Sequence, residues 1–332
     1  MNNANQSVAV VVVTYNRLAL LKECLDALRK QSRKTDAIIV VNNASSDGTS
    51  AWLETQKDVI IINRSLNEGS AGGFYFGMKY AADHNYDWIW VMDDDAAPQK
   101  NCLENMLAAF DQREPLTVLA PLVKEGNTLI TNHRSNFHVK PDLSGFQQPL
   151  ELGKELEPQV IQFASFVGFM ISKKLTDKCG LPDKDLFFQN DDVEYCLRIN
   201  KYGKIILVPS AIIEHKFVKK DVETKSKRVG GIKINNFTLT LLFVKFFVQR
   251  NKILIKQKYF KENFSPKLLT FKINVILDYL KNFFKILFLV PFKYKKIYFN
   301  IYGEAYAQGL SGKSNNENVL KMINDARIKE KK

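Results

Sequence analysis

The sequence predicts an α/β fold built on a mostly parallel, doubly wound sheet, followed by a basic, mainly helical extension. Residues 8–13, 36–41, 59–63 and 87–92 are short apolar runs rich in β-branched side chains, as in strands buried on both faces of a parallel sheet. Segments with helical spacing separate them, which is the strand–helix alternation of this fold class. Ligands bind at the carboxyl ends of such strands, so the loops after these runs are expected to face one side.

The connecting segments carry helix signals. Residues 18–32 place leucines at helical spacing, and the polar loop after the second strand offers Ser46 or Asp47 as a helix cap. A glycine-rich loop is expected after the third strand, with a helix from about Phe74 to His84.

The later part of this region is less regular. Residues 111–160 are polar, and the expectation there is irregular loops with one or two strands. Residues 163–180 predict a strand and a helix, and residues 204–215 predict a further strand.

Charge divides the chain in two. Residues 1–215 hold 22 Lys and Arg against 27 Asp and Glu, whereas residues 216–332 hold 26 against 8. The expected division is a mildly acidic domain at 1–216 and a basic, aromatic-rich helical region at 217–332, with different roles.

The basic region mixes lysine with large apolar side chains. Its two apolar segments, 239–260 and 273–299, do not reach about 18 uninterrupted apolar residues, which disfavours a spanning helix. Helices of this composition are typical of the interface of an anionic membrane. The alternative is that they pack on the first domain and only expose lysines. Nucleic acid is disfavoured because no nucleic-acid motif accompanies the charge.

The cysteines and the N-terminus bear on location. The four cysteines are far apart and form no CxxC pair, as expected of reduced thiols in a cytoplasmic protein: Cys24, Cys102, Cys179 and Cys196. The N-terminus has no basic stretch before its apolar run, so no signal peptide is expected.

Three consecutive carboxylates follow the fourth predicted strand. Asp93, Asp94 and Asp95 stand where ligands bind in such sheets. An acidic turn can simply be solvated. Alternatively, Asp93 and Asp95 can converge on one hard cation such as Mg²⁺ or Mn²⁺, and carboxylates at the mouth of a core are costly without compensation.

A second acidic group comprises Asp191, Asp192 and Glu194, which precede or open a predicted helix. Acids near a helix N-terminus interact favourably with its dipole, so capping is one interpretation. General-base catalysis by one of these carboxylates is the other.

His215 ends the strand predicted at 204–215. A single histidine is usually a packing or surface residue, although this position also suits a metal ligand. The glycine-rich segment 67–78 lacks the spacing of a dinucleotide loop, and its glycines are expected to let the backbone approach a nucleotide or sugar.

Six segments together resemble family 2 glycosyltransferases. They are VVVTYNR, VVNNASSDGT, NEGSAGG, WVMDDDAAP, NDDVEYCLR and PSAIIEHK, and they span about residues 8–216. Within that family the chain is most similar to bacterial galactofuranosyltransferases. Rhamnosyltransferases are second, since they share TYNR, NNAS, the VQRN at 248–251 and the GL-G near Gly309.

The resemblance implies the Rossmann-like GT-A fold and a set of site residues. It implies Asp192 as the catalytic base with Asp191 beside it, and a divalent cation, Mn²⁺ or Mg²⁺, held by Asp93, Asp95 and His215. It implies contacts to the nucleotide sugar from Thr14, Tyr15, Asn16, Arg17, Asn42, Asp47, Asn67, Gly72, Gly73, Asp93 and Asp94. Asn42 replaces the Asp that many relatives use to read the pyrimidine, and Asn190 replaces an acidic or aromatic residue.

The resemblance also implies an inverting transfer of a sugar from a nucleotide-diphosphate donor. The expected substrates are UDP-galactofuranose and a lipid-linked glycan acceptor in bacterial surface polysaccharide synthesis, such as O-antigen or capsule, at the inner face of the cell membrane. The alternatives are a rhamnosyltransferase using dTDP-rhamnose and, from another class, a non-catalytic glycan-binding or scaffold subunit. A nucleotidyltransferase is disfavoured because no Gly-rich, Lys- or Arg-bearing loop follows the first strand.

Overall fold

The computed structural model describes residues 6–150, 157–216, 227–229, 232–234 and 239–330. Its contacts divide the chain into two compact units. We call residues 1–138, 146–184 and 191–217 the sheet unit, and residues 139–145, 185–190 and 218–332 the helical unit. The composition of the two short segments 139–145 and 185–190 did not indicate that they group with the basic region.

The sheet unit is built around parallel strands. β1 (Val8–Thr14) pairs in parallel with β2 (Ala37–Asn42) and β4 (Trp88–Asp93), and β2 pairs in parallel with β3 (Ile60–Asn63). The apolar runs therefore form the predicted strands, with shifts of about one residue at their ends. Their carboxyl ends lie at one edge of the sheet, as expected, and this edge carries the polar loops.

The rest of the main sheet is mixed. Its order is β10-β13-β6-β12-β4-β1-β2-β3, and β12 (Phe169–Ser172) runs antiparallel between β4 and β6 (Thr117–Glu125). β13 (Lys204–His215) is parallel to β6 and also pairs with β5 (Ala96–Pro98). The 204–215 strand is thus confirmed.

Residues 111–160 hold more strands than the one or two expected among irregular loops. β6 is a buried nine-residue strand, and shorter strands follow it. The short strands are β7 (Thr128–Leu129), β8 (Arg134–Phe137), β9 (Gln147–Pro149), β10 (Gln159–Ile161) and β11 (Phe163–Ala164). β6 pairs with the neighbouring β7 and with the more distant β12 and β13.

Helices cover both faces of the sheet. α1 (Leu18–Arg29) and α4 (Cys102–Ala108) bury their apolar residues in one core with Val8, Val10 and Val12. α3 (Gly69–Asp83) packs on the opposite face, against Val11 and Val13. The remaining helices are α2 (Thr49–Leu53), α5 (Lys173–Cys179) and α6 (Asp191–Ile199).

The predicted glycine-rich loop is largely the first turn of α3. A Cβ built on Gly73 would lie 2.4 Å from Val13 Cγ1, and one on Gly77 would lie 2.2 Å from Val11 Cγ1. A Cβ on Gly72 would lie 2.6 Å from Glu68 Cβ. Close contact of α3 with the sheet accounts for Gly73 and Gly77, whereas Gly72 leaves room for Glu68 at the start of the helix.

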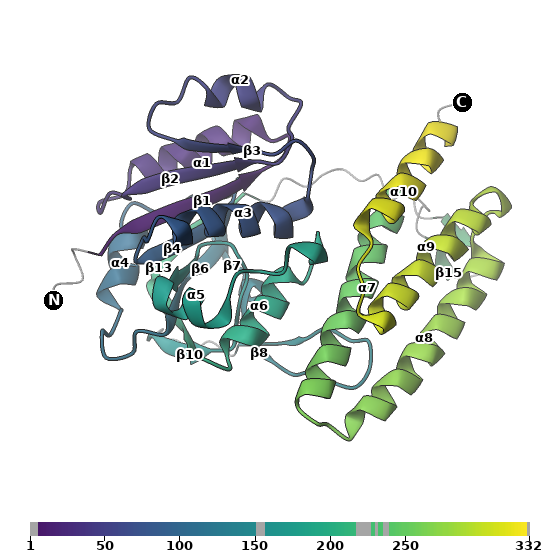
Figure 1. Ribbon diagram of the computed structural model, residues 1–332. Helices are drawn as coiled ribbons and strands as arrows, with labels where there is room; N and C mark the ends of the chain where they lie inside the picture. The colour runs from purple at the N-terminus through teal and green to yellow at the C-terminus, as the bar shows by residue number, and fades with distance from the viewer. Residues whose placement is uncertain (1–5, 151–156, 217–226, 230–231, 235–238, 331–332) are drawn as a thin grey trace. The chain divides into compact units, whose positions relative to one another are not determined.

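The described part of the helical unit is helical, as predicted. Its helices are α7 (Leu239–Glu262), α8 (Lys267–Leu289), α9 (Phe292–Ser311) and α10 (Asn316–Glu330), with the short strands β14 (Lys227–Val229) and β15 (Ile232–Ile234) (Figure 1). α7 and α9 approach closely at Gly309, where a Cβ would lie 2.7 Å from Ile253 Cβ. Of the helices described, none is both long and apolar enough to cross a bilayer.

Candidate active site

The three consecutive aspartates stand at the polar edge of the parallel sheet. Asp93 is the last residue of β4, and Asp94 and Asp95 form the turn into β5. Asp94 is only 3% exposed, and its carboxylate accepts a hydrogen bond from Thr14 Oγ1 at 2.7 Å. Asp94 therefore fastens this turn to the end of β1.

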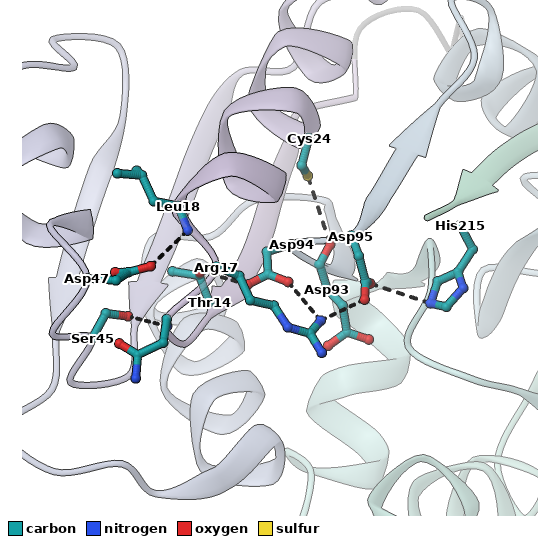
Figure 2. Close-up of polar contacts among 11 residues, drawn as sticks. Thr14, Arg17, Leu18, Cys24, Ser45, Asp47, Asp93, Asp94, Asp95 and His215 are labelled. Atoms are coloured by element: carbon teal, nitrogen blue, oxygen red, sulfur yellow. Dashed lines mark hydrogen bonds and ion pairs between the residues drawn. The ribbon is translucent and has the colours of Figure 1, made fainter. Parts of the chain in front are cut away.

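Asp95 lies between two basic side chains (Figure 2). Arg17 Nη1 is 2.7 Å from Asp95 Oδ2 and 3.2 Å from Asp94 Oδ1, and His215 Nε2 is 3.4 Å from Asp95 Oδ1. The other ring nitrogen of His215 is 3.3 Å from Glu125 Oε1. β13 pairs with β5 at His215 and Ala96, which places the histidine beside the aspartate turn.

The charges in this cluster are not balanced. Burial and the neighbouring Asp95, Asp94 and Asp191 raise the pKa of Asp93 well above its ordinary value. Burial also raises the pKa of Asp94 to about 6, against the opposing effect of Thr14 and Arg17. Crowded, partly desolvated carboxylates of this kind favour a positive ion.

The donor atoms fit a divalent cation in part. Asp95 Oδ1 is buried and accepts no hydrogen bond from the described residues, while it faces the imidazole of His215. Carboxylate and imidazole suit Mn²⁺, and carboxylate suits Mg²⁺. Within the described ranges, however, no three His, Cys, Asp or Glu side chains are grouped closely enough to hold an ion. The expected set of Asp93, Asp95 and His215 is therefore not assembled as three ligands.

The second acidic pair opens α6. Ser70 Oγ donates a hydrogen bond to Asp191 Oδ2 at 3.4 Å, and Asp192 Oδ1 accepts one from the backbone N–H of Val193 at 2.7 Å. Burial raises the pKa of Asp191 to about 6; burial and the charge of Asp191 raise that of Asp192 to about 7. Such values suit a proton acceptor near neutral pH.

The two acidic groups lie close enough to influence each other electrostatically. Asp191 is close enough to Asp93 to contribute to the raised pKa of Asp93, although the two residues are almost a hundred positions apart in the sequence. Both lie in the sheet unit.

The residues expected to contact the nucleotide fall into two sets. Tyr15 is 45% exposed, and Arg17 is partly exposed at the polar edge. Asn42 is buried: its amide donates to Ser50 Oγ and to Asn63 Oδ1.

The other polar residues of this set brace the loops. Asn16 Oδ1 accepts a hydrogen bond from the backbone N–H of Ser46. Asp47 Oδ2 accepts one from the backbone N–H of Leu18 (Figure 2). Asn67 Oδ1 accepts from Asn43 Nδ2 and from the backbone N–H of Gly69. These side chains shape the polar edge, because their bonds join neighbouring loops.

Sequence reasoning missed two neighbours of His215. Glu125 ends β6, a strand that the sequence did not reveal, and His133 lies with its ring centroid 5.1 Å from that of His215. A correct prediction of β6 would have placed Glu125 at the same edge as Asp93.

Family comparison covers about half of the chain. Residues 9–180 match the model of "Glycosyl transferase family 2". Galactofuranosyltransferase GlfT1 of Mycolicibacterium smegmatis is 32% identical over 205 residues, which cover 59% of this chain and 66% of that protein. GlfT1 of Mycobacterium tuberculosis has the same identity over 206 residues, and the match covers 60% of this chain and 66% of that protein. The dTDP-rhamnosyl transferase RfbF of Shigella flexneri is 23% identical over 272 residues, covering 81% and 84%. The chain thus aligns with just under two thirds of the length of the galactofuranosyltransferases.

Solved structures resemble the fold. GalNAc-T7 with UDP, GalNAc and Mn²⁺ has a TM-score of 0.54 at 15% identity, covering 73% of this chain and 48% of that one. Residues 1–349 of S. aureus TarS give 0.52 at 16%, covering 92% and 81%. The mannosyltransferase PcManGT of Pyrobaculum calidifontis, with GDP-Man and Mn²⁺, gives 0.51 at 15%, covering 93% and 89%. The expected GT-A fold is confirmed, and the chain belongs to glycosyl transferase family 2.

Proposed function

We propose that the protein is an inverting, metal-dependent glycosyltransferase that moves galactofuranose from UDP-galactofuranose to a lipid-linked glycan acceptor in bacterial surface polysaccharide synthesis. The observation that supports it most is the proximity of two acidic groups with different surroundings. One group adjoins Arg17 and His215, and the other begins α6 with raised carboxyl pKa values. A single displacement needs these two kinds of site on opposite sides of the sugar.

The donor side of the site would hold the nucleotide diphosphate. Arg17 and the partly exposed loop after β1 would bind and orient the donor at the polar edge. Asp93, Asp95 and His215 would hold Mn²⁺ or Mg²⁺, with a shift of side chains to bring the three together. The bound ion would supply positive charge beside the diphosphate oxygens.

The acceptor side would supply the base. The acceptor hydroxyl oxygen attacks C1 of the donor sugar and its proton passes to the Asp192 carboxylate. The bond from C1 to the phosphate oxygen breaks, and that oxygen leaves with the electron pair as part of UDP. Asp191 would raise the basicity of Asp192 by like-charge repulsion, since the two side chains are adjacent and Asp191 is only 6% exposed.

The choice of donor rests on the relatives. The two galactofuranosyltransferases are 32% identical to this chain, against 23% for the dTDP-rhamnosyl transferase. The rhamnosyltransferase match covers more of the chain, including the VQRN and GL-G segments, so dTDP-rhamnose is the second candidate.

A direct assay decides among these functions. Purified protein is incubated with UDP-galactofuranose, UDP-hexopyranoses or dTDP-rhamnose, and nucleotide release is measured with Mn²⁺ and with EDTA. We expect metal-dependent release of UDP from UDP-galactofuranose. Release only from dTDP-rhamnose would select the alternative donor, and no release from any donor would indicate a glycan-binding or scaffold subunit.

The same proposal places the enzyme at the inner face of the membrane through α8. α8 buries Phe271, Val275 and Ile286 within the helical unit, yet it exposes a second apolar stripe. This α8 stripe consists of side chains 38–75% exposed: Leu269, Ile273, Ile276, Leu277, Leu280, Phe284, Leu287 and Phe288. Their spacing of three and four keeps them on one side of the helix.

Lysines border the α8 stripe. At 100° per residue, Lys272 falls on one border, and Lys281 and Lys285 fall on the other. An apolar stripe edged by cations matches an anionic lipid surface, where the side chains enter the acyl boundary and the lysines meet headgroups. A second copy of the chain would cover the stripe without needing these lysines.

Liposome flotation tests the α8 stripe. We expect wild type to float with phosphatidylglycerol vesicles and the double variant F284S/F288S to bind about tenfold more weakly, from the lost apolar burial. Tyr202→Ser, an exposed aromatic of the sheet unit, is the control. Equal binding to neutral and anionic vesicles, or a dimer that the double variant converts to a monomer without affecting flotation, would contradict a lipid-binding role.

A further inference from the structure

The loop before the acidic pair has an unusual backbone. Phe187, Gln189 and Asn190 have φ values of 61°, 69° and 63°, in the left-handed region that costs L-residues energy. The next residue, Asp191, begins α6. Such a backbone persists only where its surroundings hold it, so the contacts of this loop matter for the residues that follow.

The holding contacts come from α7. Asn251 is fully buried, and its side-chain amide donates to three carbonyl oxygens of the loop, those of Leu186, Phe188 and Gln189, at 2.9, 3.0 and 2.7 Å. A carbonyl that points into a protein interior is costly without a donor. One side chain thus satisfies three of them.

Arg250 acts on the same loop. It is fully buried, and its Nη2 donates to the backbone oxygens of Asp185 at 3.1 Å and Leu186 at 2.8 Å. Its Nε donates to Asn251 Oδ1 at 2.8 Å, which orients the Asn251 amide toward the loop.

Aromatic packing adds to these hydrogen bonds. Phe187 stacks on Phe247 with ring centroids 4.7 Å apart, and the Arg250 guanidinium lies 4.9 Å from the Phe247 ring centroid. All of these contacts lie within the helical unit, to which residues 185–190 belong. The chain then passes directly into the sheet unit at Asp191.

We propose that Arg250 and Asn251 are positioning residues of the active site. They hold loop 185–190 in the backbone shape from which α6 starts, and so set the orientation of Asp191 and Asp192. The positions of the two carboxylates depend on the loop because a change in φ at Asn190 would rotate the start of α6. The catalytic part of this inference rests on the proposed function; the structural part stands without it.

The chain contains a matched control on the same helix. Lys256 is also fully buried in α7, and its Nζ donates to the backbone oxygens of Lys140, Asp142 and Ser144 at 3.1, 2.8 and 3.1 Å. It holds segment 139–145, which does not lead into α6. Loss of Lys256 therefore removes a comparable buried brace from the same unit.

The experiment compares Asn251→Ala, Arg250→Lys and Lys256→Met. For Asn251→Ala we expect kcat to fall at least tenfold, with UDP affinity by calorimetry and the donor KM within about threefold of wild type. Arg250→Lys keeps the positive charge but loses the several N–H donors of the guanidinium. Its kcat should lie between those of wild type and Asn251→Ala. Lys256→Met should keep kcat within about threefold of wild type, even if its melting temperature falls as much as that of Asn251→Ala.

Hydrogen exchange supplies a readout independent of activity. In Asn251→Ala, deuterium uptake should rise across residues 185–199 and stay unchanged across 139–145; Lys256→Met should give the reverse. The proposal would be overturned if Asn251→Ala and Lys256→Met, at equal melting temperatures, lost kcat equally. Unchanged deuterium uptake across residues 185–199 in Asn251→Ala would also overturn it. If Asn251→Ala alters the exchange at 185–199 but the wild-type protein is inactive with every donor, only the proposed function is refuted.

Discussion

At the scale of single residues, the site's carboxylates differ in what surrounds them. Asp94 is hydrogen-bonded to Thr14 and Arg17, and Asp95 lies between Arg17 and His215. Asp192 accepts a hydrogen bond from the backbone N–H of Val193. The sequence shows these five aspartates in two groups, and the structure shows that their partners differ. Asp94, whose part the motif alone does not define, is a buried link between β1 and the aspartate turn.

The raised pKa of Asp192 predicts a pH dependence of turnover. A base must be unprotonated, so kcat should rise with pH through about 7, where the Asp192 carboxyl beside Asp191 loses its proton. Asp192→Asn should lower kcat by about 10²–10⁴-fold and abolish the rise of kcat through pH 7. UDP binding with Mn²⁺ should persist in calorimetry. Near-normal transfer by this variant would refute the base assignment.

The same shift predicts a change in stability. The folded-state pKa of Asp192 lies above its unfolded value, so the folded form loses stability as pH rises through about 7. Asp192→Asn should then be more stable than wild type at pH 8 by about 1–2 kcal/mol, a figure reduced because Asp192 is partly exposed. Thermal unfolding at pH 5 and pH 8 should show the difference growing with pH. A stability difference that is the same at pH 5 and pH 8 would contradict the raised pKa of Asp192.

A change at Asp95 tests the metal set. Asp95→Ala removes the carboxylate that faces His215, so Mn²⁺-dependent UDP binding should weaken at least tenfold in calorimetry. Binding measured in EDTA should change less, because the nucleotide contacts remain. Unchanged affinity in Mn²⁺ would remove Asp95 from the ligand set.

At the scale of elements, the helix α3 shows what local pattern reveals and what it does not. The sequence predicted a helix from about Phe74, yet α3 begins at Gly69. Glycines lower helix propensity, which argues for a loop locally. Tertiary packing decides otherwise, since only glycine lets α3 approach Val11 and Val13.

This account predicts opposite effects for two glycine substitutions. Gly73→Ala should lower the free energy of unfolding by about 1–3 kcal/mol, because Val13 in the sheet cannot move away from the new methyl group. Gly303→Ala, in α9 with nothing within 4 Å of its built Cβ, should raise it by about 0.5–1 kcal/mol. Chemical denaturation measures both. A neutral Gly73→Ala would contradict the packing explanation.

At the scale of the whole molecule, the sequence predicted what short-range pattern encodes. The strands β1 to β4, β13 and the helical C-terminal region follow from apolar runs and charge division. β6 and its last residue, Glu125, were not located, because the strand stands within the largely polar stretch 111–160. The grouping of loop 185–190 with α7 also depends on long-range contacts, those of Arg250 and Asn251, which no local pattern contains.

The most direct test of the central claim is the anomeric configuration of the product. The account predicts that, with UDP-galactofuranose, Mn²⁺ and a lipid-linked acceptor, proton NMR of the new linkage shows the configuration opposite to that of the donor. A single displacement assisted by Asp192 produces this inversion. A product that retains the donor configuration would contradict the account.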